Sequence, residues 1–372
     1  MKIGFDVSPL TAHRTGVGNY CYYLLKHILE LAEVHEFRGF ASGRAPMELG
    51  ELADRLPVRR VPVPTRLLYK SWEWFGMPAM ERFLGAVDVY HATNYFLPPT
   101  RRARRVVTIH DLAFLAVPEL CSPSIVGPFA RGIGRFATGA DAIMAYSEST
   151  KADIVTYLEV SPERVTVAPM AVDEGFQPME REEAELLVKE RFGVEPPFLL
   201  FVSTLEPRKN VVGLIEAFKH LVDEIPHNLV LVGSVGWNAE PILEAMAHPS
   251  VKDRIIRPGF VKHLELPAFY CAADAFVFPT HYEGFGLPLL EALTCGCPVV
   301  AADNSSVPEV TGGAALLTSS HDTEAVADNV RRILHDQDLR ESLIARGKEH
   351  AAGFSWRACA TRTLEVYEQL AG

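Results

Sequence analysis

Residues 275–302 read AFVFPTHYEGFGLPLLEALTCGCPVVAA, and the order of residue types in this stretch predicts a strand, a helix and a second strand. Residues 275–278 and 298–301 are short apolar runs, which is typical of buried strands. Between them, Pro288 suits the first turn of a helix that we expect from Leu289 to Thr294. This order is typical of α/β folds, in which helices cover a parallel sheet.

The same alternation of short apolar runs and amphipathic segments occurs in both halves of the chain. The expected strands of the first half are residues 2–7, 58–63, 87–91, 106–110, 142–146 and 165–168. Those of the second half are residues 198–203, 229–233, 275–278 and 298–301. Residues 169–197 contain four prolines and a charged run, so we interpret them as a hinge with one surface helix.

A length of 372 residues is enough for two α/β domains, which we place at residues 1–172 and 173–355. After residue 322 the sequence becomes helical and charged. A terminal helix at residues 356–372 carries an apolar stripe, made of Trp356, Leu364, Tyr367 and Leu370. The helix must bury this stripe, and the first domain is one of the two surfaces on which it can pack.

Composition excludes several classes of protein. A formal net charge of −11 argues against a general nucleic-acid binder, which needs a surplus of Lys and Arg. The six cysteines are scattered without metal spacing or a disulfide framework, which favours a reducing cytoplasm. The apolar run at the start is too short for a signal peptide, and no run reaches the roughly 18 apolar residues that span a bilayer. The sequence therefore predicts a cytoplasmic protein.

Ligands of parallel sheets bind beyond the carboxyl ends of the strands, so the loops after the strands are the candidate sites. The first loop continues into TGVGNY, where Gly16 and Gly18 open a helix whose amides could hold phosphate. A plain glycine turn is the alternative. The second loop is STLEPRKN, in which Arg208 and Lys209 could neutralise a diphosphate. A solvated charged turn is the alternative there.

The third loop lies within residues 275–302. Gly284 and Gly286 would let the backbone approach a ligand, and the helix that follows would offer its N-terminus to phosphate. Glu283 and Glu291 are eight residues apart, and we expect both to project toward the mouth of a cleft, where carboxylates accept hydrogen bonds from sugar or ribose hydroxyls. Two ordinary solvated glutamates are the alternative.

The fourth loop is VVTIHDLAF, in which His110 and Asp111 follow a strand of the first domain. His110 could donate a hydrogen bond to a sugar hydroxyl or stabilise charge, and a buried structural histidine is the alternative. The fourth loop meets the third only if the two domains oppose each other.

At these residues the chain resembles family 4 of the retaining glycosyltransferases, also called glycosyl transferases group 1. The most specific element is E-x7-E, from Glu283 to Glu291, followed by GGAALL at residues 312–317. The resemblance implies the α/β GT-B architecture, in which two facing Rossmann-like domains enclose an interdomain cleft. It also implies a nucleotide-diphosphate sugar as co-substrate, with no cofactor and no metal.

The resemblance assigns roles to individual residues. Glu283 would bind the donor sugar, Glu291 the ribose, and Arg208 and Lys209 the diphosphate. His110 would contact the sugar. The other donor-binding residues that it implies are Gly16, Val17, Phe260, Val261, Gly284, Phe285, Gly286 and Leu287. The family's usual glycine after the basic pair is Asn210 in this sequence.

The strings TGVGNY and NSSVPEV resemble a bacterial subgroup that builds surface polysaccharides. We therefore expect mannosyl transfer from GDP-mannose to a saccharide or lipid-linked saccharide. A UDP- or ADP-sugar donor, a GT-B phosphorylase, a sugar-nucleotide epimerase and a binding module without turnover are the alternatives. A NAD dehydrogenase is disfavoured, because the first loop lacks the full glycine fingerprint and the acidic residue that follows it.

Two segments could seat the first domain on anionic lipid at the inner face of the membrane. Residues 65–77 interleave aromatic and basic side chains, and residues 101–105 read RRARR. Ordinary core aromatics and a solvated basic turn are the alternative.

Overall fold

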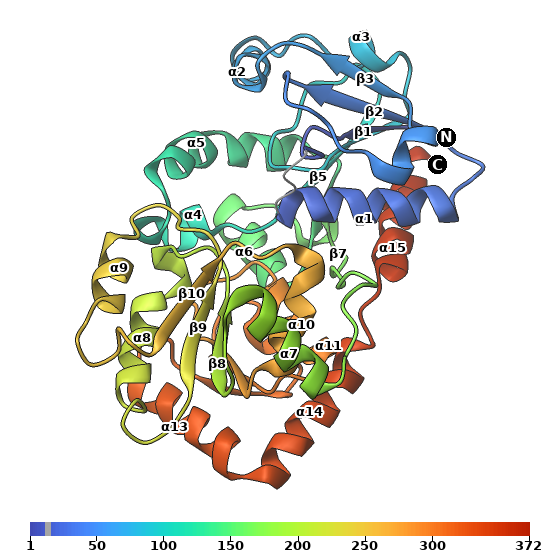
Figure 1. Cartoon of the computed structure of the whole chain (residues 1–372). Helices are drawn as coiled ribbons and strands as arrows, with labels where there is room; N and C mark the ends of the chain where they lie inside the picture. The colour runs from blue at the N-terminus through green and yellow to red at the C-terminus, as the bar shows by residue number, and fades with distance from the viewer. Residues whose placement is uncertain (12–15) are drawn as a thin grey trace. The chain divides into compact units, whose positions relative to one another are not determined.

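The computed structural model describes residues 1–11 and 16–372, so the end of the first predicted loop, residues 12–15, lies outside the described residues (Figure 1). The chain forms two compact units. The first comprises residues 1–116, 123–170 and 355–372, and the second comprises residues 117–122 and 171–354. Each unit is built around its own parallel sheet.

The first unit holds a seven-stranded parallel sheet in the order β3-β2-β1-β4-β5-β6-β7. Its strands are β1 (Lys2–Asp6), β2 (Glu36–Ser42), β3 (Val58–Val61), β4 (Val89–Ala92), β5 (Arg104–Thr108), β6 (Ala142–Ala145) and β7 (Val165–Val167). Its α-helices are α1 (Gly16–Leu31), α2 (Thr65–Phe75), α3 (Glu81–Leu84), α4 (Ala113–Ala116), α5 (Pro123–Gly139), α6 (Glu148–Leu158) and α15 (Trp356–Ala371). Short 3-10 helices are η1 (Gly50–Asp54) and η3 (Pro162–Arg164).

Successive side chains of β1 point to opposite faces of this sheet, and helices cover both faces. The Phe5 ring packs on Tyr367 of α15, with ring centroids 5.9 Å apart. A Cβ on the neighbouring Gly4 would lie 2.8 Å from Cδ1 of Leu84 in α3. A side chain at Gly4 would therefore force the Leu84 side chain to move.

The second unit holds a six-stranded parallel sheet in the order β10-β9-β8-β11-β12-β13. Its strands are β8 (Phe198–Val202), β9 (Asn228–Val232), β10 (Ile255–Gly259), β11 (Ala275–Phe278), β12 (Val299–Ala302) and β13 (Ala315–Thr318). Its α-helices are α7 (Arg181–Phe192), α8 (Val211–Lys219), α9 (Glu240–Met246), α10 (Leu266–Ala272), α11 (Leu287–Cys295), α12 (Val307–Thr311), α13 (Thr323–His335) and α14 (Gln337–Ala351). Its 3-10 helices are η2 (Pro118–Leu120), η4 (Pro207–Lys209) and η5 (His263–Glu265).

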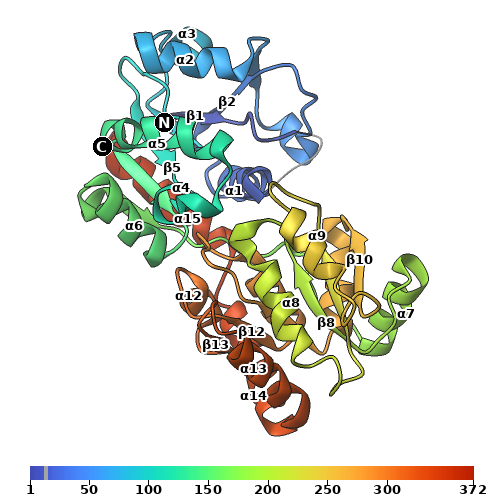
Figure 2. The same cartoon turned by 90° about the vertical axis from the view of Figure 1, so that its left-hand side faces the viewer.

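Helices cover both faces of the second sheet. Contacts join α8 to α9 and α13 on one face, which is turned toward the viewer in Figure 2. On the other face α10 contacts α7 and α11, and α11 contacts α14 (Figure 1). Because both faces are covered, strands such as β8 and β11 are buried along their whole length.

All ten predicted strands are present, with ends that differ by a few residues, and three further strands were missed. The missed strands are β2, β10 and β13. β2 contains Arg38 and Gly39, and β10 ends in Pro258-Gly259, which are poor local signals for a strand. Backbone pairing with a neighbouring strand stabilises these segments instead, and sequence windows do not detect it.

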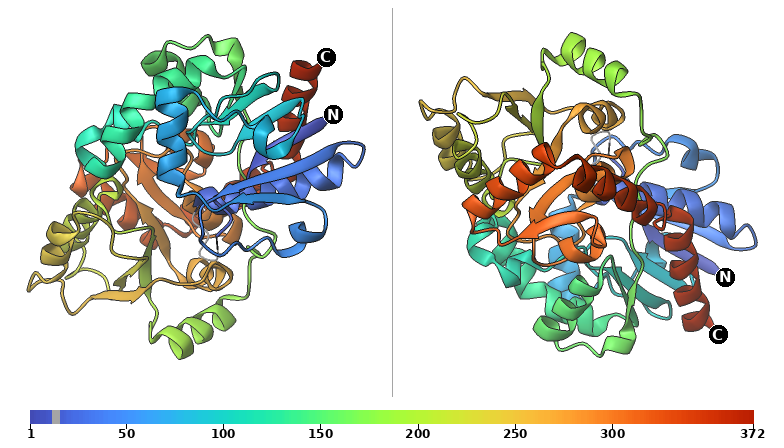
Figure 3. Two further views of the ribbon diagram at one scale, coloured as in Figure 1. Left: turned by 90° about the horizontal axis from the view of Figure 1, so that it is seen from above. Right: turned by 90° about the horizontal axis from the view of Figure 1, so that it is seen from below.

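The terminal helix α15 belongs to the first unit and lies against α1 (Figure 3). The Trp356 ring stacks on Tyr23 of α1, with centroids 5.4 Å apart. The Tyr367 hydroxyl hydrogen-bonds Nδ1 of His91 in β4 at 2.6 Å. The last residues of the chain therefore complete one face of the first sheet.

Candidate active site

The turn between β8 and α8 carries the two predicted cations on a well-defined backbone. Asn210 has a φ of 53°, in the left-handed region that favours glycine and that Asn tolerates better than most residues. Its Oδ1 accepts a hydrogen bond from Gly213 N at 3.3 Å, and its Nδ2 donates to the carbonyls of Pro279 and Ser320 at 2.9 and 2.7 Å. Asn210 therefore takes the conformation that a glycine would have and also ties the turn to the β11 and β13 loops.

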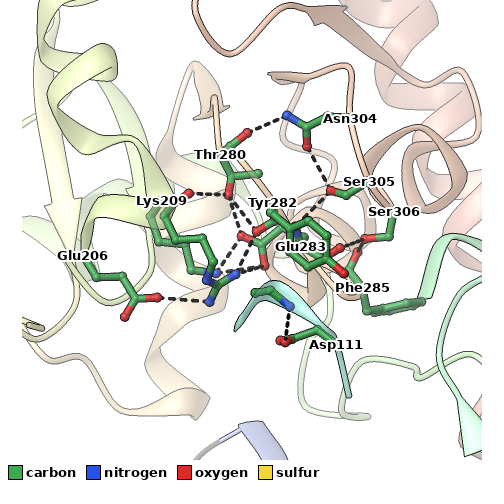
Figure 4. Close-up of polar contacts among 12 residues, drawn as sticks. Asp111, Glu206, Lys209, Thr280, Tyr282, Glu283, Phe285, Asn304, Ser305 and Ser306 are labelled. Atoms are coloured by element: carbon green, nitrogen blue, oxygen red, sulfur yellow. Dashed lines mark hydrogen bonds and ion pairs between the residues drawn. The ribbon is translucent and has the colours of Figure 1, made fainter. Parts of the chain in front are cut away.

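Lys209 and Glu283 form a buried ion pair in the second unit (Figure 4). Lys209 Nζ lies 2.6 Å from Oε1 and 2.9 Å from Oε2 of Glu283. The Thr280 hydroxyl donates to Oε1 at 2.8 Å. Lys209 is 8% exposed and Glu283 is 6% exposed, so the solvated alternative is wrong for both residues.

Arg208 connects the same turn to the loop that follows β11. Its Nη1 donates to the Tyr282 carbonyl at 2.8 Å and lies 3.5 Å from Oε2 of Glu283. Its Nη2 pairs with Glu206 Oε1 at 3.0 Å. The sequence drew attention to Arg208 but not to Glu206, whose role appears only when the turn is folded.

The two cations control the ionisation of Glu283. Burial alone would raise the pKa of its carboxyl, but Lys209 and Arg208 outweigh burial and hold the pKa below its ordinary value. Glu283 is therefore an anion at neutral pH, able to accept hydrogen bonds from hydroxyl groups.

The loop after β12 holds the backbone of the predicted glycine-rich segment. The Ser305 hydroxyl accepts a hydrogen bond from Glu283 N at 2.9 Å, and the Ser306 hydroxyl donates to the carbonyls of Glu283 and Phe285 at 3.0 and 2.8 Å (Figure 4). Asn304 Nδ2 donates to the Thr280 carbonyl at 2.9 Å. Sequence reasoning did not assign these three residues a role, although their place after a strand was a usable signal.

The helix α11 begins at Leu287, two residues earlier than predicted. Gly286 precedes it with a φ of 91°, and a Cβ there would lie 2.9 Å from Cδ1 of Leu289. Pro288 lies in the first turn, as expected, but Leu287 before it already belongs to the helix. The first turn of α11 thus directly follows the loop that holds Glu283, in the place where a helix favours an anion.

Glu291 is buried, like Glu283, so the solvated alternative is wrong for this carboxylate too. It is 4% exposed, and its Oε2 accepts a hydrogen bond from the Tyr270 hydroxyl of α10 at 2.8 Å. Burial raises the pKa of its carboxyl. Across the described residues, no hydrogen bond joins Glu291 to Glu283, so the structure gives the two acids different partners.

Phe260 and Val261 follow β10, at the edge of the second sheet. The Phe260 side chain is 75% exposed, whereas Val261 is buried. Gly259 has a φ of 86°, and its carbonyl accepts a hydrogen bond from Gly233 N at 2.8 Å. The segment predicted to contact a base therefore also lies beyond the carboxyl end of a strand.

The first unit holds the remaining predicted residues. Gly16 and Val17 begin α1, and His110 follows β5. His110 is 8% exposed, its Nδ1 hydrogen-bonds the Tyr146 hydroxyl, and burial lowers its pKa to about 4. Its imidazole is therefore neutral at pH 7, and it can act as a hydrogen-bond donor but not as a cation.

Each unit places polar side chains beyond the carboxyl ends of parallel strands, the position at which Rossmann-like proteins bind their ligands. Within residues 1–11 and 16–372, no group of three or more His, Cys, Asp or Glu side chains is arranged to hold a metal ion.

Two family models match the chain: Glycosyltransferase Family 4 over residues 14–176 and Glycosyl transferases group 1 over residues 182–350. The chain is 29% identical to O-antigen chain mannosyltransferase B of Escherichia coli over the whole length of both proteins. It is 30% identical to D-inositol 3-phosphate glycosyltransferase of Streptomyces bingchenggensis, over 97% of this chain and 86% of that protein. A solved sucrose-phosphate synthase from Thermosynechococcus elongatus is similar in fold, with a TM-score of 0.78 at 22% identity over 100% and 99% of the two chains. The chain belongs to the family 4, group 1 glycosyltransferases and has their GT-B fold.

Proposed function

We propose that this protein is a metal-independent, retaining hexosyltransferase that moves mannose from GDP-mannose to a saccharide or lipid-linked saccharide during surface polysaccharide synthesis. The observation that carries the proposal is the buried cluster of Arg208, Lys209 and Glu283 beside the start of α11. The likeness to O-antigen chain mannosyltransferase B supports the choice of mannose and of a polysaccharide acceptor.

In the proposed reaction the bond between the anomeric carbon and the diphosphate breaks as the acceptor hydroxyl attacks from the same face. The acceptor proton passes to an oxygen of the departing diphosphate. Arg208, Lys209 and the first turn of α11 would stabilise the charge that develops on that group, in place of a metal ion. Glu283 would accept hydrogen bonds from hydroxyls of the donor sugar, and Glu291 from the ribose.

The other predicted donor contacts belong to the same proposal. Gly16, Val17 and His110 of the first unit would contact the phosphate and the sugar. The backbone of residues 284–287 would contact sugar or phosphate, and that of residues 260–261 the base. The two sets of residues lie in separate compact units, and binding of one donor by both is what a nucleotide-sugar complex would test.

The test is transfer of labelled sugar from GDP-mannose by the purified protein in excess EDTA, with the anomeric configuration of the product read by NMR. Arg208→Ala should lower turnover by at least a hundredfold, because a charge-assisted contact worth about 1.5–3 kcal/mol or more is lost in the transition state. Lys219→Ala is the control, since Lys219 lies in α8 of the same unit and pairs only locally with Glu216. Unchanged transfer by Arg208→Ala, or an absolute need for a divalent metal, would contradict this mechanism.

A UDP- or ADP-sugar donor is the second candidate. The relative with D-inositol 3-phosphate glycosyltransferase activity is about as similar to this chain as the mannosyltransferase, so sequence similarity does not single out one sugar. Parallel assays with GDP-, UDP- and ADP-sugars decide between them. Donor binding without hydrolysis or transfer would indicate the remaining alternative, a non-catalytic nucleotide-sugar binding protein.

We also propose that the protein acts in the cytoplasm, at the inner face of the membrane. Across the described residues, no helix combines the length and the apolar character needed to cross a bilayer. All six cysteines are free thiols, which fits a reducing compartment. Contact with the membrane would instead use α2, whose outward face is mostly apolar and basic.

A further inference from the structure

His110 and Tyr146 are held together at the ends of two neighbouring strands of the first unit. β5 and β6 are paired in parallel, and Ile109 N continues the ladder by donating to the Met144 carbonyl at 3.0 Å. Nδ1 of His110 and the Tyr146 hydroxyl form a short hydrogen bond, and their rings lie 5.3 Å apart. His110 is one of the residues predicted from the sequence, whereas no sequence pattern points to Tyr146.

The hydrogen-bonding needs of Tyr146 decide the direction of this bond. The phenol is buried, and its hydroxyl has no partner other than Nδ1 of His110 in the part of the chain that the structure describes. Burial raises its pKa well above the ordinary value, so it keeps its proton. A buried hydroxyl must donate that proton to an acceptor, and the one available acceptor is Nδ1.

The proton of His110 must then lie on Nε2. The ring is neutral at pH 7, because burial lowers its pKa, against smaller opposite effects of Asp111 and of the Thr93 backbone. A neutral imidazole carries one proton, and Nδ1 already accepts from Tyr146. Nε2 is therefore an N–H donor.

That donor is buried and makes no hydrogen bond of regular geometry among the described residues, although the Thr93 backbone lies near enough to the ring to raise its pKa slightly. Aromatic rings enclose the imidazole: Tyr20 lies 5.8 Å away and Tyr95 5.3 Å away, both edge-on. A buried N–H without an acceptor is unfavourable, because it loses its hydrogen bond to water and gains none in return. An oxygen atom supplied by a ligand would remove that penalty.

We propose that Tyr146 is a positioning residue that fixes His110 as the Nε2–H tautomer, so that His110 donates a hydrogen bond to an oxygen of the bound donor sugar. This inference rests on the proposed function for the identity of the ligand, but the tautomer is a property of the protein alone. The two parts can therefore fail separately.

The first test is the tautomer of His110 in the protein without ligand, read from the ¹⁵N shifts of the imidazole at pH 7. The wild-type protein should show a protonated Nε2 and an unprotonated Nδ1. Tyr146→Phe should mix the two tautomers or favour Nδ1–H. Tyr90→Phe is the matched control, because it also removes a buried phenol from this sheet but has no hydrogen bond to His110. A protonated Nδ1 in the wild-type protein would overturn the proposal.

The second test is a double-mutant cycle on sugar transfer. Tyr146→Phe should lower kcat/KM about tenfold, the value expected for one hydrogen bond. In a His110→Ala background the same substitution should have little further effect. An equal fall in both backgrounds would show that Tyr146 acts only on stability and would overturn the positioning role. If the wild-type protein transfers no sugar while His110 shows the Nε2–H tautomer, the proposed function fails and the tautomer assignment stands.

Discussion

Charge balance around Arg208 and Lys209 limits how a diphosphate can bind. The two cations face the carboxylates of Glu206 and Glu283, so the formal charges of the four side chains sum to zero. A bound diphosphate would add negative charge to a neutral cluster. We therefore expect a diphosphate to use the N-terminus of α11 and to take over part of the charge that Arg208 shares with Glu206.

The two cations should differ in their effect on stability. Lys209→Ala leaves the buried Glu283 carboxylate without its main partner, so we expect a loss of about 3–5 kcal/mol in the free energy of unfolding. Arg208→Ala should cost about 1 kcal/mol, because Glu206 is partly exposed and Glu283 keeps Lys209 as its partner. Urea denaturation checks this difference, with Lys219→Ala as the control. Equal losses would contradict the buried pairing of Lys209.

Replacing Glu291 should change stability and activity in opposite directions. Burial raises the pKa of its carboxyl, so the folded state favours the protonated form. The stability that this form confers is present below the ordinary Glu pKa and is lost as the pH rises through the raised value. At neutral pH the burial of Glu291 is therefore a cost that Glu291→Gln removes, while Gln can still accept from Tyr270.

We expect Glu291→Gln to melt at the wild-type temperature or a few degrees higher at pH 7 and to lose about tenfold or more in kcat/KM. The gain in stability over the wild-type protein should shrink toward pH 4. Calorimetry and transfer assays measure the two effects, with Glu216→Gln on α8 as the control. A strongly destabilised Glu291→Gln with normal kinetics would assign Glu291 a purely structural role.

At the scale of elements, α2 separates its aromatic residues into two groups. Trp72 is buried, and its Nε1 donates to the Pro78 carbonyl at 3.0 Å. Trp74 and Phe75 are 67% and 69% exposed, and Lys70 Nζ lies 5.6 Å from the centre of the Trp74 ring. The core-aromatic alternative therefore holds for Trp72 and is wrong for Trp74 and Phe75.

This exposed face predicts binding to anionic lipid vesicles. The outward side chains of α2 are apolar or basic, and Met77 follows them, which matches the composition of interfacial helices. Trp74→Ser with Phe75→Ser should abolish cosedimentation with phosphatidylglycerol vesicles at moderate salt without changing the far-UV circular dichroism.

The matched control is Tyr157→Ser, which removes an exposed aromatic ring from α6. Arg101, Arg102 and Arg104 are exposed, whereas Ala103 is buried. Replacing Arg101 and Arg102 therefore gives a second test. Neutralising them should weaken the salt-dependent part of binding. Wild-type protein that stays in the supernatant at low salt would exclude this role for α2.

At the scale of the whole molecule, a ligand that binds only the folded protein must raise its melting temperature. We expect GDP to stabilise the protein more than UDP or ADP. At a hundred times the dissociation constant the gain is about 2.7 kcal/mol, which corresponds to several degrees. Arg208→Ala should abolish the shift, whereas Lys219→Ala should retain it. A larger shift with UDP would replace the guanine nucleotide in the proposal, and no shift with any of the three would count against nucleotide binding.

Much of the candidate site could be predicted from the sequence. Arg208, Lys209, Glu283 and His110 follow predicted strands, and the structure brings the first three into contact in the second unit. Other residues of the candidate site could not be predicted from the sequence. Some residues could not be predicted because their hydrogen-bond partners are distant in sequence: these are Tyr146, Tyr270 and the hydroxyls of residues 305–306. Glu206 could not be predicted because it lies in a turn whose conformation does not follow from residue propensities.

The sequence by itself determined the two parallel sheets and the loops that carry the chemistry, because apolar periodicity and glycine or proline positions are local properties of the chain. Only the tertiary structure decided which carboxylates are buried, which cation pairs with Glu283 and which nitrogen of His110 keeps the proton. Those properties depend on burial and on contacts between strands that are adjacent in space. Two single positions show the same difference. The sequence does not reveal that Gly4 lies close to the Leu84 side chain, or that Asn210 takes the backbone conformation of the glycine that the family has there.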